Sequence, residues 1–288
     1  MDHKVCVVIA GDSNIFPLTI GCLLSISQLR ERGISINFID TGCNPVQLER
    51  IKPLVDVVIK FDEQLSIFPK GDLRPYWRAQ ACRPFIHKYF PDYEIYFWLD
   101  SDLWFQNPLS VLDLVQDVKK FGSVIVSEFY EGYDTFQDRV KSNHYYMQKK
   151  NFMNFYKGKI NINNEAYYNI GVLGVSKSSG LFEEFEKVLK ILYGVVYTHM
   201  TDQIAFNEVL FKTRLFASIH PLNNWMCNLG SSNLIDGVFF DPFNDKSKIN
   251  VMHLSGKNKL KRYSKMLFNN GKYLEDIKGM INNEGYYV

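Results

Sequence analysis

The chain has 288 residues, of which 33 are Lys or Arg and 31 are Asp or Glu, so its formal net charge is +2. A hydrophobic content of 46% and a charged content of 22% are typical of a globular protein and exclude general disorder. The near balance of charge argues against a nucleic-acid-binding protein, which would carry a large basic excess. At roughly 100–200 residues per domain, the length allows one large domain or two small ones.

The five cysteines are widely spaced and include no Cys-x-x-Cys pair, which argues against a zinc knuckle or a redox motif. We therefore expect buried, reduced thiols in a cytoplasmic protein. The N-terminal apolar segment Val5–Ala10 is too short for the core of a secretory signal. No apolar run approaches the ~18 residues needed to cross a bilayer, so a membrane-spanning protein is not expected.

Strand and helix patterns alternate through the first half of the chain. Short apolar, β-branched runs predict strands, and apolar residues at helical spacing predict helices between them. The predicted strands are Val5–Ala10, Ile34–Asp40, Val55–Phe61 and Glu94–Asp100. The predicted helices are Pro17–Arg30, Pro45–Leu54 and Pro75–Phe90. The almost continuously apolar run Glu94–Asp100 is typical of a strand that is covered on both faces in a parallel sheet.

The second half is more elaborate. Strands are predicted at Ser123–Phe129, Asn169–Ser176 and Lys248–His253, and helices at Leu181–Tyr193 and Asp202–Lys212. The segment between Tyr130 and Tyr168 is polar, aromatic and irregular, which favours an insertion or a lid. We therefore predict an α/β fold in one domain, with a mostly parallel central sheet covered by helices and an elaborated C-terminal half.

Two acidic residues follow the most apolar of the predicted strands. Asp100 and Asp102 are two residues apart, so on extended backbone their side chains would point the same way. Neighbouring carboxylates repel each other unless a proton or a cation lies between them. A hard divalent ion, Mn²⁺ or Mg²⁺, would relieve this repulsion and also bind phosphate oxygens. Because ligands of open α/β sheets bind at the carboxyl ends of the strands, the pair predicts a metal site, with a turn or helix cap as the alternative.

The third candidate ligand, His253, is the last residue of the strand predicted at Lys248–His253. The imidazole of His253 suits a divalent transition metal such as Mn²⁺. Gly256 would let the backbone approach a phosphate closely, and Lys257 or Lys259 could neutralise the charge of a diphosphate. A hydrogen-bonded histidine with no metal is the alternative interpretation.

In this order and spacing, the motifs resemble those of nucleotide-sugar glycosyltransferases of the GT-A fold. They are most similar to glycosyltransferase family 8, which includes glycogenin and bacterial lipopolysaccharide galactosyl- and glucosyltransferases. The match extends from Val5 to about Lys259. It implies that Asp100, Asp102 and His253 bind the metal ion.

The resemblance also implies roles for residues on both sides of the metal site. The residues that would bind the donor nucleotide and its diphosphate are Ala10, Asp12, Asn14, Arg83, Ser101, Gly256, Lys257 and Lys259. The residues that would face the donor sugar, and that are the catalytic candidates, are Asn169, Asp202 and Gln203. A helix-capping role is the alternative for Thr201 and Asp202. Arg78 competes with Arg83 for the basic role, and Ile170 replaces the usual small residue beside Asn169.

The implied reaction is the metal-dependent transfer of a hexose from a UDP-sugar to an acceptor hydroxyl, with retention of anomeric configuration. Retention could follow a double displacement on Asp202, Gln203 or Asn169, or a front-side attack assisted by the leaving phosphate. The acceptor would be a carbohydrate, a glycolipid or a protein. Two other classes remain: a non-catalytic sugar- or nucleotide-binding protein of the same fold, and an Asp-based phosphatase. The phosphatase is disfavoured because Trp104 stands where that class has Thr or Val.

The resemblance divides the chain into a glycosyltransferase domain at residues 1–262 and a C-terminal tail at residues 263–288. Within the domain, the donor is expected to bind residues of about 1–130, and the acceptor side to comprise about 131–262. Basic residues interleave with apolar ones between Lys257 and Phe268, a pattern that can dock on anionic lipid. This predicts a peripheral membrane contact, with a solvated face beside a phosphate site as the alternative.

Overall fold

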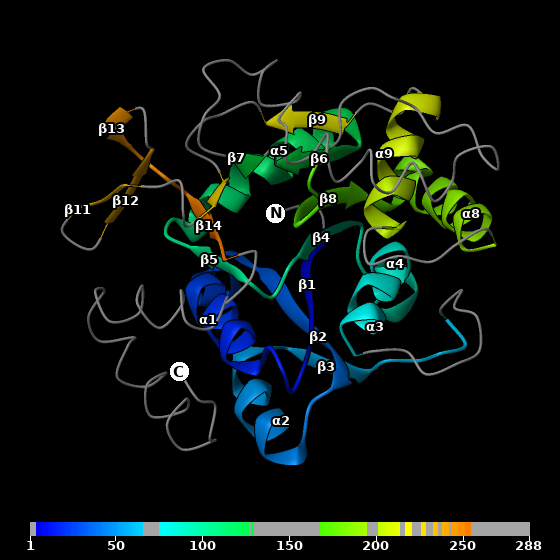
Figure 1. Cartoon of the computed structure of the whole chain (residues 1–288), viewed down its shortest axis with the longest axis horizontal. Helices are drawn as coiled ribbons and strands as arrows, with labels where there is room; N and C mark the ends of the chain where they lie inside the picture. Colours follow the sequence, from blue (N-terminus) through cyan, green and yellow to red (C-terminus); the bar gives the residue numbers. More distant parts are fainter. Residues whose placement is uncertain are drawn as a thin grey trace.

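The computed structural model describes residues 4–65, 75–126, 128–129, 168–194, 201–213, 217–220, 226–228, 233–235, 238–241 and 244–254. Its framework is a seven-stranded sheet in the order β3-β2-β1-β4-β8-β6-β9 (Figure 1). These strands are β1 (Val5–Asp12), β2 (Ile34–Gly42), β3 (Val57–Lys60), β4 (Ile95–Leu99), β6 (Ser123–Val126), β8 (Val172–Ser176) and β9 (Ala217–His220). Strand β8 runs antiparallel to both of its neighbours, whereas the other neighbouring strands are parallel. The predicted α/β fold with a mostly parallel central sheet is confirmed.

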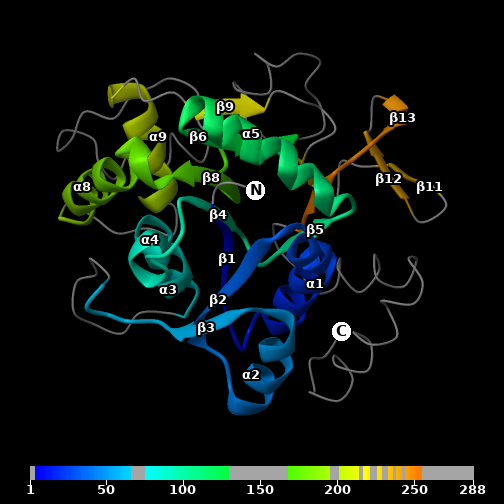
Figure 2. The same ribbon diagram turned by 180° about the vertical axis from the view of Figure 1, so that it is seen from behind.

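Each face of this sheet carries an apolar core, because successive side chains of a strand point to opposite faces. In β4, Ile95, Phe97 and Leu99 belong to one core, and Tyr96 and Trp98 belong to the other. The first core is covered by α1 (Phe16–Ile26), α2 (Pro45–Ile51) and α5 (Val111–Phe121). The second is covered by α3 (Pro75–Cys82), α4 (Ile86–Tyr89), α8 (Leu181–Tyr193) and α9 (Thr201–Thr213), so the sheet lies between two layers of helices (Figures 1 and 2).

Helix α8 begins and ends at the predicted residues, because its apolar side chains recur at helical spacing and it has acidic residues in its first turn. Helices α1 and α2 are shorter than predicted and continue as 3₁₀ turns, η1 (Ser27–Arg32) and η2 (Lys52–Leu54). Two more 3₁₀ turns, η4 (Pro108–Ser110) and η5 (Lys177–Ser179), precede α5 and α8. None of the helices in the described part of the chain is both long enough and apolar enough to cross a membrane.

The single helix predicted at Pro75–Phe90 is wrong. The structure has α3, then the 3₁₀ turn η3 (Arg83–Phe85), then α4. Pro84 lies inside this turn, and because proline lacks an N–H it cannot continue the hydrogen-bond ladder of an α-helix. Arg83 therefore lies at a break between two helices.

A second sheet joins distant segments in the order β5-β14-β10-β7. Its strands are β5 (Leu103–Phe105), β14 (Val251–His253), β10 (Met226–Asn228) and β7 (Glu128–Phe129). A third sheet contains β11 (Asn233–Ile235), β12 (Val238–Asp241) and β13 (Asn244–Lys248). The late strand predicted at Lys248–His253 is thus divided between two sheets, and so is the strand predicted at Ser123–Phe129.

Among the cysteines whose side chains are described, the expectation of free thiols is confirmed for all four, and that of burial for three. Cys6, Cys22, Cys43 and Cys82 are free, and all but Cys43 are buried. Burial raises the pKa of each of these thiols well above its usual value. The thiols are therefore protonated at neutral pH and behave as small apolar side chains.

Candidate functional site

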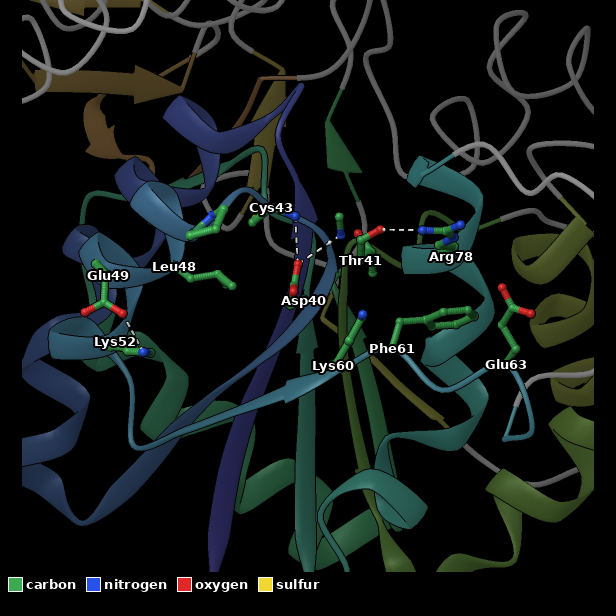
Figure 3. Close-up of a pocket in the computed structure, with 12 residues that line it drawn as sticks. Asp40, Thr41, Cys43, Leu48, Glu49, Lys52, Lys60, Phe61, Glu63 and Arg78 are labelled. Carbon is green, nitrogen blue, oxygen red and sulfur yellow. Dashed lines mark hydrogen bonds and ion pairs between the residues drawn. The ribbon is translucent and has the colours of Figure 1, made fainter.

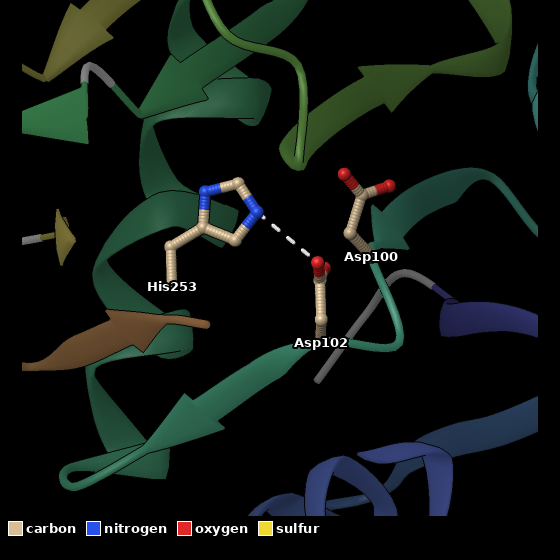
Figure 4. A group of neighbouring side chains, drawn as sticks. All are labelled: Asp100, Asp102 and His253. Atoms are coloured by element: carbon tan, nitrogen blue, oxygen red, sulfur yellow. Dashed lines mark ion pairs between the residues drawn. The ribbon is translucent and has the colours of Figure 1, made fainter. Parts of the chain in front are cut away.

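Three side chains from two distant segments meet at the carboxyl end of β4. Asp100 and Asp102 lie between β4 and β5, and His253 ends β14. Strand β14 pairs antiparallel with β5 and sets His253 opposite Leu103, while the backbone N–H of Leu254 donates to the carbonyl of Asp102 at 2.8 Å. One ligand atom from each of the three side chains lies within 4.8 Å of the others (Figure 4).

The backbone between the two aspartates is a turn, so the extended geometry assumed from the sequence is wrong. The N–H of Leu103 donates to the carbonyl of Asp100 at 3.2 Å and closes this turn. The carboxylates come together because the turn brings the two residues close, and they have different neighbours. Asp102 faces His253, with 3.4 Å between its Oδ1 and the imidazole Nε2, whereas Asp100 faces Arg83 and Trp98.

This donor set fits a divalent metal ion. Two carboxylates supply the oxygen ligands that Mg²⁺ and Mn²⁺ prefer, and an imidazole shifts the preference towards a transition metal. Asp102 and His253 are both less than a tenth exposed. Buried charge is costly unless it is paired or bound to a metal, so an ion at this position would stabilise the two carboxylates.

The buried guanidinium of Arg83 connects Asp100 to the start of α9. Its Nη2 donates to Oδ1 of Asp100 at 2.6 Å, and its Nη1 donates to Oδ2 of Asp202 at 2.5 Å. Burial raises the pKa of the Asp202 carboxyl to about 6, although the charge of Arg83 acts in the opposite direction. Burial also acts to lower the pKa of Arg83, but the two carboxylates outweigh it and raise that pKa. The arginine predicted to contact the donor is thus held between a candidate metal ligand, Asp100, and a catalytic candidate, Asp202.

Five of the eight residues predicted to bind the donor nucleotide and its diphosphate line one pocket of about 340 Å³, and two of the three candidate metal ligands are also in its wall. The predicted residues found in its wall are Ala10, Asp12, Asn14, Arg83, Asp100, Ser101 and Asp102. The backbone N–H of Asn14 donates to Oδ1 of Asp12 at 2.6 Å, and the Asn14 side chain is exposed. Burial raises the pKa of the Asp12 carboxyl, and the N–H of Asn14 opposes this rise. Asp12 is therefore a buried acceptor at the end of β1.

Asn169 lies beside Asp100, on the chain entering β8. Its Oδ1 accepts a hydrogen bond from the N–H of Gly171 at 2.6 Å. A Cβ on Gly171 would lie 2.8 Å from this oxygen and 3.0 Å from Oδ2 of Asp100, so only glycine fits without displacing both groups. Gln203, next to Asp202 on α9, is buried, and its Nε2 has no hydrogen-bond partner among the described residues.

Arg78 does not share the position of Arg83. Its Nη1 donates to the carbonyl of Thr41 at 3.2 Å, in a separate pocket of about 740 Å³ over the ends of β2 and β3 (Figure 3). In the same pocket, Oδ1 of Asp40 accepts from the N–H groups of Gly42 at 2.9 Å and Cys43 at 2.7 Å. The structure thus assigns the contact with Asp100 to Arg83. The pocket itself was not predicted from the sequence.

The sequence also did not reveal the role of Gln106, which holds the segment before β14 in place by hydrogen bonds. Its Nε2 donates to the carbonyl of Phe239 at 3.0 Å and to that of Ile249 at 2.8 Å, while its Oε1 accepts from the N–H of Phe239. Its backbone N–H donates to the carbonyl of Asn250 at 2.8 Å. Because these partners are more than 130 residues away, no local pattern marks Gln106 as part of the support for His253.

Some predicted residues lie outside the described part of the chain. They are Gly256, Lys257 and Lys259, the acceptor-side segment 131–165 and the tail 263–288. Their predicted roles remain predictions.

No protein-family model matches the chain, and no curated protein matches it by sequence. Solved structures do match. The apo structure of the bifunctional glycosyltransferase WbbM aligns with a TM-score of 0.62 and 18% identity over 96% of this chain, which spans 52% of the WbbM chain.

Two further structures match over almost their whole length. The galactosyltransferase LgtC, in complex with donor and acceptor sugar analogues, aligns with a TM-score of 0.52 and 18% identity over 93% of this chain and 97% of its own. The apo form of mouse xyloside xylosyltransferase 1 aligns with a TM-score of 0.50 and 17% identity over 90% of this chain and 98% of its own. All three neighbours are glycosyltransferases, and the chain has the GT-A fold that its sequence motifs imply.

Proposed function

We propose that the protein is a metal-dependent glycosyltransferase that moves a hexose from a UDP-sugar to an acceptor hydroxyl. The observation that carries this proposal is the convergence of Asp100, Asp102 and His253 beside the pocket of Asp12 and Asn14. The fold shared with three glycosyltransferases supports it, and one of them, LgtC, binds donor and acceptor sugar analogues.

On the nucleotide side, Asp12 and Asn14 would hold the nucleoside by hydrogen bonds, which favour one donor over another. Asp100, Asp102 and His253 would hold Mn²⁺, or Mg²⁺ in its place. When bound, the ion supplies a positive charge that stabilises the departing diphosphate. Three residues beyond the described part of the chain would also contact this diphosphate: Gly256, Lys257 and Lys259.

On the sugar side, the described residues offer the ion pair of Arg83 and Asp202 and the Gln203 amide, whose Nε2 has no hydrogen-bond partner among them. Arg83 cannot move far, because Asp100 and Asp202 hold both of its terminal nitrogens. The unpaired Nε2 of Gln203 would donate to a sugar hydroxyl, which would satisfy an otherwise costly buried donor. Asn169, whose Oδ1 lies close to Asp100, would face the same sugar.

The proposal includes retention of anomeric configuration, by one of two routes. A double displacement requires Asp202, Gln203 or Asn169 to bond to the anomeric carbon, whereas a front-side attack requires no bond to the protein. Mass spectrometry of the protein during turnover with a slow fluorinated donor separates them. A glycosylated peptide containing one of these residues supports double displacement, and an unmodified protein supports front-side attack.

The remaining parts of the proposal concern the acceptor and the location. We propose a carbohydrate, glycolipid or protein acceptor, and a cytoplasmic enzyme that contacts membranes peripherally through the basic segment 257–268. Each basic side chain near an anionic membrane surface contributes about 1 kcal/mol to the free energy of binding. Because this attraction is electrostatic and is screened by ions, the membrane contact would weaken as the salt concentration rises.

The test is the release of UDP from UDP-glucose, UDP-galactose and UDP-N-acetylglucosamine with Mn²⁺ present. The proposal predicts slow release of UDP from one donor, dependence on the metal, and loss of release in Asp102→Asn. Asp113→Asn, an exposed aspartate on α5, is the matched control and should behave as the unchanged protein does.

Three other results would contradict the proposal. Donor binding without release from any UDP-sugar, with or without added acceptors, would indicate a non-catalytic sugar- or nucleotide-binding protein. Phosphate release from phosphomonoesters would indicate a phosphatase. Equal release by Asp102→Asn would show that the metal group is not used.

A further inference from the structure

Trp98, the penultimate residue of β4, contacts two of the charged groups of the site. Its indole Nε1 donates to Oδ1 of Asp100 at 2.7 Å. Its ring lies under the guanidinium of Arg83, with 4.9 Å between the ring centre and Cζ. The residue is only 2% exposed, whereas the Asp100 side chain is 25% exposed, and both residues line the pocket of about 340 Å³.

The contact with Arg83 depends on the fold. Trp98 packs in the same core as Cys82 and Phe85, which lie on either side of Arg83 in the chain. Phenylalanine, the commoner apolar aromatic residue in this chain, would fill most of the same space. It has no donor, however, and could not make the hydrogen bond to Asp100 that a buried indole N–H requires.

The two donors occupy the same oxygen of Asp100. Oδ1 accepts from Nε1 of Trp98 and from Nη2 of Arg83 at 2.6 Å. A carboxylate oxygen has two lone-pair directions, so both of those on Oδ1 are taken. Oδ2 points instead towards Gly171, where it lies 3.0 Å from the position of an added Cβ.

We infer that Trp98 is a positioning residue for the metal site: it fixes the Asp100 carboxylate so that Oδ2 alone is presented to the ion. It also supports the face of Arg83, which holds the same Oδ1 and extends to Asp202. Hydrogen bonds from outer residues orient metal-binding carboxylates and raise metal affinity. This inference rests on the proposed function, because it assumes that Asp100 binds the ion.

The test compares two tryptophan substitutions. Trp98→Phe keeps an aromatic ring beside Arg83 and removes only the donor. Trp104→Phe makes the same change in β5, where the side chain is half-buried against the first core and the residue lies opposite Met252. Binding of Mn²⁺ in the presence of UDP is measured by calorimetry, and folding by thermal unfolding.

The inference predicts that Trp98→Phe weakens Mn²⁺ binding about tenfold, the lower end of the usual effect of an outer residue. Trp104→Phe should bind Mn²⁺ as the unchanged protein does. A folded Trp98→Phe with unchanged Mn²⁺ affinity would overturn the inference and leave the proposed function intact. Failure of the unchanged protein to bind Mn²⁺ would overturn both.

A second measurement needs no variant at position 98. The chain has four tryptophans, so the indole N–H signals of ¹⁵N-labelled protein can be followed while Mg²⁺ is added with UDP. The Trp98 signal, identified by substituting the other three in turn, should move more than that of Trp104. Equal or absent movement of the Trp98 signal while Mg²⁺ binds would contradict the inference.

Discussion

The guanidinium of Arg83 contacts the carboxylate of Asp202, 119 residues further along the chain, in a fully buried ion pair. The same guanidinium contacts Asp100, so one positive charge holds two carboxylates. This arrangement links the break after α3 to the first turn of α9 and to the end of β4. Arg83 therefore holds the parts of the site together, in addition to being a candidate contact of the donor.

We therefore predict that Arg83→Met destabilises the protein by about 3–5 kcal/mol, because a buried carboxylate loses its partner. Urea unfolding measures the change. Asp202→Asn added to Arg83→Met should recover part of the loss, since it removes the unpaired charge. A double variant less stable than Arg83→Met would contradict this account of the pair.

Gly171→Ala should lower metal affinity and activity. The added Cβ would come within 2.8 Å of Oδ1 of Asn169 and 3.0 Å of Oδ2 of Asp100, and both groups would have to shift. Gly194→Ala is the matched control, because its nearest contact, a backbone oxygen at 3.4 Å, is an ordinary one. Calorimetric Mn²⁺ titration of both variants tests this prediction. Equal affinities would show that the structure accommodates the added Cβ without moving the Asp100 carboxylate out of place.

Gln106→Ala should weaken the attachment of β14 to β5. It removes the side-chain hydrogen bonds to Phe239 and Ile249. The carbonyl of Phe239 keeps the N–H of Ile249 as a donor, but the N–H of Phe239 loses the acceptor Oε1, and such a loss costs about 1–3 kcal/mol. We expect a lower free energy of unfolding together with weaker Mn²⁺ binding, because His253 follows this segment. If Mn²⁺ affinity stays unchanged while stability falls, Gln106 supports the fold without supporting the site.

Stability should fall in mild acid because of His87. This side chain stacks on Phe182 with 4.4 Å between ring centres. Burial lowers the pKa of His87 below the usual 6.5. The nearby Lys88 and Lys177 also lower this pKa, whereas Glu183 and Glu186 raise it by less than burial lowers it. Below pH 6.5 the unfolded chain therefore binds the proton more readily than the folded one, and the stabilising contribution is lost as the pH falls further.

His87→Phe keeps the stacked ring and removes the titration. Its free energy of unfolding, measured in urea, should fall less between pH 7.5 and 5.5 than that of the unchanged protein. If the free energy of unfolding fell equally in the two proteins, groups other than His87 would cause the acid sensitivity, and the prediction would fail.

Local patterns predicted the elements that local interactions determine. Helix α8 was predicted residue for residue because its apolar stripe is regular. The apolar run that became β4 was recognised because both of its faces are buried. The helix expected at Pro75–Phe90 failed at Pro84, although a proline inside a helical pattern is itself a signal for a break.

The site was predictable in its residues but not in its geometry. The sequence indicated Asp100, Asp102 and His253, and the structure brings them together. It could not indicate that β14 pairs with β5 in a second sheet, since strand pairing between distant segments leaves no local pattern. The contacts of Trp98 and Gln106 were missed for the same reason: both residues match the ordinary pattern of their own segments.

The most direct test of the whole account is a count of Mn²⁺ ions bound in the presence of UDP, by electron paramagnetic resonance. We predict one ion per chain for the unchanged protein and for Asp92→Asn, an exposed aspartate away from the site. His253→Ala should bind the ion far more weakly, because it removes a ligand contributed by β14. Mn²⁺ bound equally well by His253→Ala would contradict the claim that two distant segments form one metal site.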